Sequence, residues 1–249
     1  MEKILLSVIL LTAAGLCLAA APARPHLLIT TESSPPSAMM GERGVTGFAT
    51  EKIRLIMERA GIDYEIVMLP WMRAYTLAEK NADTCVYSTT RVPEREALFK
   101  WVGPTHENDW TLFGRADRVY KIATIEEARK YRIGAYNGDV RSEALIAEGF
   151  NVDAVQDKLS NPRKLLVGRI DLWASSVRVG SALVAENGWT GKIVPVLTFK
   201  RTELYLACNP NVPDALVAKM NATLRAMNSE GVSGAIERRY NYVSPGASR

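Results

Sequence analysis

Residues 87–95, Tyr-Ser-Thr-Thr-Arg-Val-Pro-Glu-Arg, bring together the groups that bind anions. Residues 83–87 have the composition of a strand, and the hydroxyl residues 88–90 follow at its end. Pro93 suits the first position of a helix, because its missing N–H group would have no partner there, and Arg95 follows within the first turn. Free N–H groups, hydroxyls and a guanidinium at one point favour an anion, most naturally a carboxylate held through two hydrogen bonds. An ordinary strand–turn–helix connection with a solvated arginine explains the same residues equally well.

An alternation of strands and helices surrounds this segment. Apolar runs at 27–30 and 64–68 predict two strands in addition to 83–87. Amphipathic patterns at 47–60 and 71–79 predict helices between them, with Gly61 ending the first. Such alternation indicates a mostly parallel sheet with helices on its faces.

The second half of the chain repeats this rhythm without a detectable sequence repeat. Asp139 is expected to cap a helix that begins at Val140, and Ser160 is expected to cap the next one. A late strand at 204–208 precedes a long helix that begins at Pro213. The other expected strands are 110–113, 132–136, 152–155 and 169–174, and the expected helices are 124–130, 140–148, 160–167 and 176–187.

The first 23 residues have the pattern of a secretory signal peptide. Lys3 gives a positive start, residues 4–18 are apolar, and small residues follow at 19–23. The apolar run is too short for an ordinary membrane span, so we expect cleavage and export to the periplasm, with an uncleaved anchor as the less favoured alternative. Two cysteines then remain, Cys85 and Cys208. An oxidising compartment allows a disulfide, but both are equally explained as small buried hydrophobes, the interpretation that we prefer.

Composition and missing motifs narrow the function. The chain of 249 residues is long enough for one large domain or two small ones, and its formal net charge of +4 is too small to indicate nucleic-acid binding. No Walker loop, Cys-x-x-Cys, His-Glu-x-x-His or Gly-x-Ser-x-Gly motif occurs, and the two histidines are not in a metal-spaced cluster. We therefore expect no metal, no cofactor and a binding protein rather than an enzyme.

Several short motifs occur in a distinctive order and spacing. They are Thr31-Glu32 with Pro35-Pro36, Gly47-Phe48, Pro70-Trp71, Thr90-Arg91-Val92-Pro93-Glu94-Arg95, Arg132-Ile133-Gly134 with Gly138, and Gly168-Arg169-Ile170-Asp171. Together they resemble the family 3 extracellular solute-binding proteins, the periplasmic receptors of amino-acid-type ABC importers. The likeness covers nearly the whole mature chain, although no single motif is specific.

The resemblance implies an α/β fold of the two-lobed periplasmic-binding-protein type II, each lobe a mostly parallel sheet flanked by helices. Lobe one would hold residues 24–109 and 206–249, and lobe two would hold residues 110–205. The chain would cross between the lobes near Asp109-Trp110 and near Glu203-Leu204-Tyr205. A ligand would lie in the cleft between the lobes, where strand ends and helix starts meet.

The resemblance also implies roles for individual residues. Arg95 matches the arginine that holds the ligand carboxylate, and Ser88 and Thr90 match the residues that support it. Trp71 matches an aromatic position that packs on the ligand, although helix-to-sheet packing explains it as well. Gly138 and Asp139 match a loop whose backbone meets the carboxylate.

The sequence departs from the family pattern in lobe two. Amino-acid receptors usually carry an aspartate near Ser175-Ser176 that pairs with the ligand ammonium, and Ser176 has no charge. A buried ammonium without an anion is costly, so either Glu32 supplies the anion or the ligand has no amine. Four arginines would favour an anion if they faced the cleft: Arg73, Arg91, Arg141 and Arg178.

The function implied is a periplasmic receptor that captures a small polar, carboxylate-bearing solute, an amino acid or related organic anion, for an ABC importer. We expect a monomer that delivers its solute to an inner-membrane permease. The alternative is a periplasmic sensor or accessory protein that signals to a membrane partner and transports nothing. A third, less favoured class is an enzyme built on this fold, similar to the cyclohexadienyl dehydratases.

Overall fold

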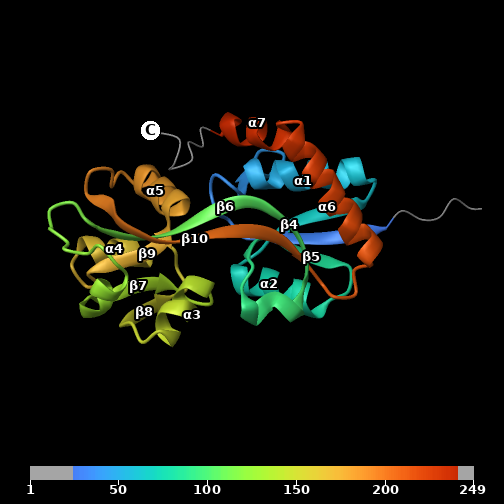
Figure 1. Ribbon diagram of the computed structural model, residues 1–249. Coiled ribbons are helices and arrows are strands. Elements are labelled where there is room, and N and C mark those ends of the chain that lie inside the picture. Colours follow the sequence, from blue (N-terminus) through green and yellow to red (C-terminus); the bar gives the residue numbers. More distant parts are fainter. Residues whose placement is uncertain (1–24, 241–249) are drawn as a thin grey trace, which may run out of the picture.

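A computed structural model describes residues 25–240 (Figure 1). The expected signal peptide and residues 241–249 lie outside the described residues. Two bodies, which we call lobe one and lobe two, are joined by a pair of long strands, β6 (Lys100–Arg115) and β10 (Ile193–Cys208). One eight-stranded sheet runs through both lobes in the order β4-β1-β5-β10-β6-β9-β7-β8. The pairs β1–β4, β1–β5, β7–β8 and β7–β9 are parallel, and the pairs that involve β6 or β10 are antiparallel.

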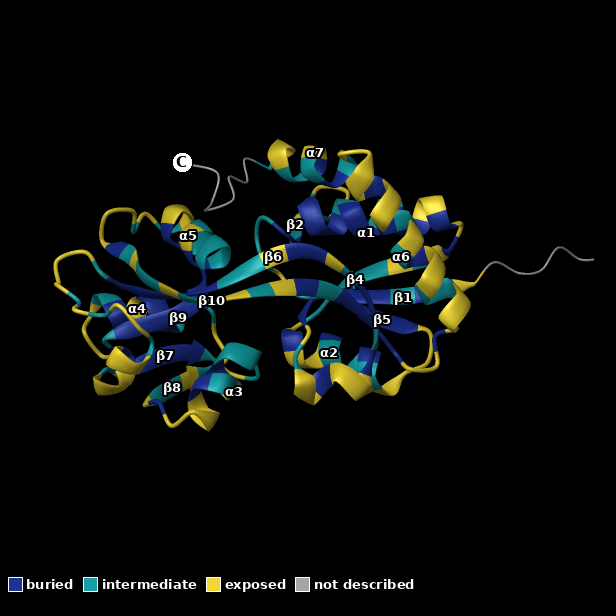
Figure 2. Cartoon of the chain, viewed as in Figure 1, coloured by how far each residue is buried: buried dark blue, intermediate teal, exposed yellow. Residues whose placement is uncertain are grey.

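Lobe one has an apolar core on each face of its sheet. Helices α1, α6 and α7 cover one face, and α2 covers the other. Figure 2 shows buried strands between helices whose outer sides are exposed. The elements of lobe one are β1 (His26–Thr31), β2 (Met39–Gly41), β3 (Gly44–Thr46), α1 (Phe48–Ala60), β4 (Asp63–Met68), α2 (Trp71–Lys80), β5 (Thr84–Thr90), the 3-10 helix η1 (Pro93–Leu98), α6 (Asp214–Ser229) and α7 (Val232–Arg239).

Lobe two has the same layered plan. Leu145 of α3 belongs to the core on one face of the sheet, and Leu165 of α4 and Val184 of α5 belong to the core on the other. Its elements are the 3-10 helix η2 (Glu126–Lys130), β7 (Ile133–Tyr136), α3 (Val140–Ala147), β8 (Val152–Val155), α4 (Ser160–Leu166), β9 (Leu172–Ser176) and α5 (Val177–Glu186).

The two connecting strands are much longer than the sequence indicated. β6 (Lys100–Arg115) and β10 (Ile193–Cys208) each have 16 residues and pair along their whole length. The polar middle of each strand hides its continuity, and only residues 110–113 and 204–208 were predicted as strands. The polar middle residues cross between the lobes, where no apolar core demands hydrophobic side chains. The predicted lobe boundaries fall inside β6 and β10 and stay predictions.

Cys85 and Cys208 form a disulfide, so the preferred interpretation of two separate buried thiols was wrong. They are direct partners in the antiparallel pair of β5 and β10, and both are fully buried. Their separation of 123 positions hides this proximity in the sequence. The bond ties the last residue of β10 to the centre of the lobe-one sheet.

Three local differences from the predictions have simple causes. Pro93 begins a helix as expected, but the helix is a short 3-10 turn. Ser160 is the first residue of α4 and not its cap, and its hydroxyl donates to the carboxylate of Asp157 at 2.7 Å. The strands β2 and β3 and the helix α7 were not predicted, since each is too short for a clear periodic pattern.

Candidate functional site

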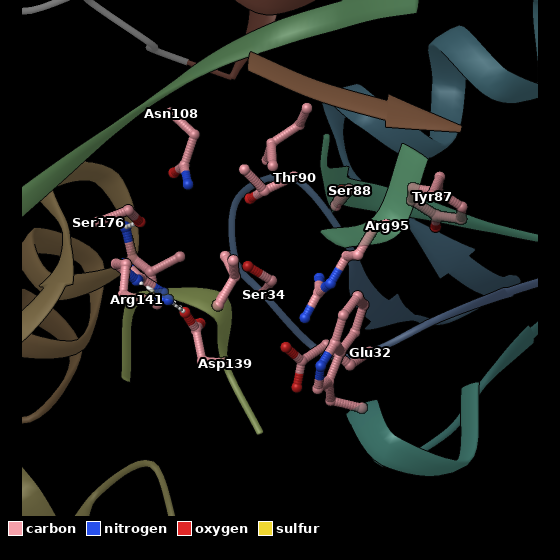
Figure 3. Close-up of a pocket in the computed structure, with 14 residues that line it drawn as sticks. Glu32, Ser34, Tyr87, Ser88, Thr90, Arg95, Asn108, Asp139, Arg141 and Ser176 are labelled. Atoms are coloured by element: carbon pink, nitrogen blue, oxygen red, sulfur yellow. Dashed lines mark hydrogen bonds and ion pairs between the residues drawn. The ribbon is translucent and has the colours of Figure 1, made fainter. Parts of the chain in front are cut away.

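A cavity lies between the two lobes, where strand ends from both sides meet (Figure 3). It encloses about 570 Å³ of space between protein atoms, its opening to solvent included. The lining residues are Glu32, Ser34, Trp71, Tyr87, Ser88, Thr90, Arg95, Asn108, Asp139, Val140, Arg141, Ser176, Val179 and Leu204. All of the predicted site residues except Gly138 are among them. Their role toward a ligand stays a prediction.

The topology explains why these residues meet. In a parallel sheet the carboxyl ends of the strands share one edge, and ligand sites form there. Glu32 follows β1, and Ser88 and Thr90 end the parallel neighbour β5. Asp139 and Ser176 follow or end β7 and β9, which are also parallel neighbours. The two edges face one another because β6 and β10 join the lobes.

Arg95 is held inside the cavity by an aromatic ring. Its residue is only 7% exposed, and its guanidinium lies 4.9 Å from the ring centre of Tyr75. Nη2 donates a long hydrogen bond of 3.4 Å to Glu143 Oε2, which belongs to lobe two. The cation–π contact with Tyr75 helps to hold the guanidinium at the cavity, where its N–H groups suit a planar anion.

Ser88 has a strained backbone and an unused hydroxyl. Its φ of 60° is uncommon for a residue other than glycine. The register between β5 and β10 shifts at this point, so Ser88 lies in a β-bulge. Its buried Oγ has no hydrogen-bond partner within residues 25–240. Backbone strain and an unsatisfied hydroxyl are typical of binding sites, and Thr90, which is 6% exposed, lies beside it on the same strand.

Trp71 connects the lobes by a hydrogen bond. Its Nε1 donates to the carbonyl oxygen of Gly138 at 3.0 Å, and the ring also packs on Tyr75. Gly138 has a φ of 73°, and a Cβ atom there would lie 2.4 Å from Met72 Sδ. Gly138 is not among the residues that line the cavity, and its missing Cβ atom permits the close approach of Met72 from the other lobe.

A second link across the cleft joins Glu32 of lobe one to Lys158 of lobe two. The Lys158 Nζ lies 2.7 Å from Glu32 Oε2 and also donates to the carbonyl oxygen of Ser33. Burial raises the pKa of the Glu32 carboxyl, and the ion pair offsets this only in part. Sequence reasoning missed Lys158, which precedes α4 and belongs to no motif.

Asp139 and Arg141 form a closed pair on the lobe-two wall. Asp139 caps α3 as predicted, accepting from the Arg141 backbone N–H at 2.8 Å. The Arg141 side chain returns two hydrogen bonds to the same carboxylate, at 3.0 and 2.6 Å. Burial alone would raise the pKa of Asp139, but the contact with Arg141 brings it below its ordinary value. The carboxylate is therefore ionised and already neutralised.

Ser176 and the remaining arginines complete the wall. The Ser176 residue is 1% exposed, and its Oγ accepts the Val179 N–H at 3.1 Å as the cap of α5. Of the four arginines considered in the sequence, Arg141 alone lines the cavity. Arg91 pairs with Glu96, Arg178 donates to the Glu107 carbonyl oxygen and lies over Phe48, and Arg73 is exposed. Asn108 and Leu204, from the connecting strands, were not predicted.

The described part of the chain offers little to other site types. No group of three or more metal-binding side chains occurs within residues 25–240. Over the same residues, every helix is too short or too polar to cross a membrane.

Two α/β lobes joined by two strands, with a polar cavity between them, define the class of two-lobed periplasmic-type binding proteins. The chain matches the profile of the bacterial extracellular solute-binding proteins, family 3, over residues 27–242, and it belongs to this family. The predicted family and fold class are thereby confirmed. The family and the fold are those of binding proteins and not of enzymes.

Solved structures show the same fold at low sequence identity. A histidine kinase sensor domain with similarity to periplasmic binding proteins has a TM-score of 0.80 and 18% identity, covering 87% of this chain and 96% of that chain. An ancestral arginine-binding protein bound to arginine has a TM-score of 0.74 and 20% identity, and the match covers 87% of this chain and 98% of that chain. ArtJ, the arginine-, lysine-, histidine-binding protein of Geobacillus stearothermophilus, has a TM-score of 0.74 and 17% identity, and the match covers 89% of this chain and 97% of that chain. No curated protein matches the chain significantly.

Proposed function

We propose that this protein captures a small carboxylate-bearing solute in the cleft and delivers it to an ABC importer in the membrane. The observation that carries the proposal is the guanidinium of Arg95, which is buried in the cavity and bonded weakly to Glu143. A carboxylate would replace that long contact with two short charge-assisted hydrogen bonds. The Ser88 hydroxyl, which lacks a partner within the described residues, and the neighbouring Thr90 would support the same group.

The interlobe contacts couple this capture to closure. Trp71 with Gly138 and Glu32 with Lys158 join opposite lobes and exist only when the lobes are close. A solute that contacts both walls therefore favours the same arrangement. In this proposal Trp71 packs on the solute, and Asp139 and Ser176 form the opposite wall.

The place of action follows from the family and the N-terminal sequence. Extracellular solute-binding proteins work outside the cytoplasm, and residues 1–23 have the composition of a signal peptide. We propose that the mature protein is a periplasmic monomer whose partner is an inner-membrane permease. Western blotting of periplasmic fractions and the mass of the mature chain test export and cleavage, and size-exclusion chromatography with light scattering tests the monomer.

Thermal stabilisation by a panel of amino acids, organic acids and small peptides tests the binding role. A true ligand raises the melting temperature of the wild type, and Arg95→Ala removes most of this rise. Arg91→Ala is the matched control, because Arg91 lies on the same segment but outside the cavity and pairs with Glu96. A ligand that stabilises Arg95→Ala as strongly as the wild type would rule out this role for Arg95.

A sensor is the second candidate, favoured by the structural similarity to a histidine kinase sensor domain. Such a protein would use the same cleft but would signal to a membrane partner. Uptake of radiolabelled ligand by cells with and without the gene separates the two roles. Lost uptake supports transport, whereas unchanged uptake with a lost transcriptional response supports sensing. Turnover of bound carboxylates by purified protein would instead indicate an enzyme.

A further inference from the structure

The acidic side chains that line the cavity already have cationic partners. Within residues 25–240 these acids are Glu32 and Asp139. Lys158 lies 2.7 Å from Glu32, and Arg141 makes three hydrogen bonds to Asp139. An incoming ammonium would have to compete with a lysine or an arginine that is already in place. Burial also raises the pKa of Glu32, which further disfavours its charged form.

Neither Ser176 nor Glu143 provides a free anion for an ammonium group inside the cavity. Ser176 Oγ is the cap of α5 and accepts the Val179 N–H, so its acceptor capacity is partly used. Glu143 lies at the rim, where its side chain is 58% exposed and faces Arg95. An anion bound to Arg95 would repel Glu143 toward solvent, away from the interior of the cavity.

The unused groups in the cavity are mainly hydrogen-bond donors. Arg95 presents a guanidinium from lobe one, with only the 3.4 Å contact to Glu143. Arg141 Nη1 is buried and has no hydrogen-bond partner in the described part of the chain. Figure 3 shows the two guanidinium groups reaching the cavity from opposite walls. Arg141 also lines an adjoining cavity, which Glu32 of lobe one borders together with Tyr136, Trp173 and Ser175 of lobe two.

We propose that the ligand is a carboxylate that carries a second oxygen acceptor and no ammonium group: an oxo acid, a hydroxy acid or a dicarboxylic acid. This rests on the proposed function. Its first carboxylate lies on Arg95, and its second oxygen accepts from Arg141 Nη1. An ammonium would enter a site without an available anion, which costs affinity by roughly 100-fold or more.

Isothermal titration with matched pairs tests this class. The pairs are 2-oxoglutarate with glutamate, succinate with aspartate, and lactate with alanine. At least one amine-free member binds, and it binds about 100-fold or more tightly than its amino acid. An amino acid that binds as tightly as its partner, with Arg95→Ala abolishing both, overturns this inference alone. Binding that is indifferent to Arg95→Ala, or failure of every pair, overturns the proposed function and this inference together.

A substitution at Ser176 sharpens the test. Ser176→Asp and Ser176→Asn both keep an acceptor that can cap α5, but only aspartate adds an anion to the wall. Ser176→Asp improves amino-acid binding and so lowers the ratio of affinities for the amine-free acid and its amino acid by roughly tenfold or more. Ser176→Asn leaves amino-acid binding weak. If both variants change this ratio of affinities equally, the missing charge at Ser176 does not explain the weak binding of amino acids, and the inference is overturned. Circular dichroism of both variants verifies that α5 is intact.

Discussion

The disulfide between Cys85 and Cys208 should contribute a large part of the stability of this protein. The bond lies in the lobe-one core and closes a loop that contains both connecting strands and all of lobe two. Replacing both cysteines by alanine releases that loop in the unfolded chain, whereas the folded chain loses only two small buried side chains. The effect is therefore mainly on the unfolded state.

The size of the effect follows from the loop length. For a separation of 123 positions, the chain-entropy relation gives a stabilisation of about 5 kcal/mol at 25 °C. Typical measured values are about 2–4 kcal/mol. Because whole domains are usually stable by only about 5–15 kcal/mol, this one bond would account for a substantial fraction. The prediction is a loss of about 3–5 kcal/mol in the Cys85→Ala/Cys208→Ala variant.

Urea unfolding followed by tryptophan fluorescence measures this loss. The oxidised wild type is compared with the double variant, each with and without a reductant. Reductant should destabilise the wild type and leave the double variant unchanged, which separates the bond from the side chains. A double variant within about 1 kcal/mol of the oxidised wild type would show that the bond contributes little to stability, and free thiols in mass spectrometry of protein from the periplasm would show that it does not form.

Three further predictions concern the contacts across the cleft. Lys158→Met leaves the Glu32 carboxylate without its partner and should weaken ligand binding by about tenfold in calorimetry, since the loss of a charge-assisted hydrogen bond is worth about 1.5–3 kcal/mol. The pKa of Glu32 is raised in the folded state. The contribution of the Glu32 carboxyl to the free energy of unfolding therefore falls as pH rises above about 4.3, the ordinary pKa of glutamate. The free energy of unfolding of Glu32→Gln, relative to the wild type, should thus be higher at pH 7 than at pH 4 in urea unfolding. The same difference at both pH values would contradict a raised pKa of Glu32. Gly138→Ala, at a φ of 73° and beside Met72, should destabilise the approach of the lobes and lower affinity several-fold, and unchanged affinity would show that the contact is dispensable.

Much of the cavity could be predicted because its residues follow strand ends. Ser88 and Thr90 end one strand, Arg95 follows it, and Asp139 follows another strand, so strand–helix alternation alone places them at a sheet edge. The family resemblance then indicated that the edges of two lobes face each other. The absence of a charge at Ser176 was also visible in the sequence.

The rest depends on distances that a sequence does not contain. Lys158 reaches Glu32 only because the lobes are close, and no motif marks it. Asn108 enters the wall because β6 runs through both lobes, and its polar middle resembles a loop. Cys85 and Cys208 meet through the register of an antiparallel pair formed by distant segments. In each case the deciding factor is tertiary geometry and not local composition.

A crystal structure of the protein with its bound solute shows whether Arg95 holds a carboxylate in the cleft. The solute can be identified by mass spectrometry of the molecule that copurifies with the gently isolated protein. We expect a carboxylate between the lobes, with its oxygens about 2.8 Å from guanidinium nitrogens of Arg95. A solute bound outside this cavity, or an uncharged or cationic group placed against Arg95, would contradict it.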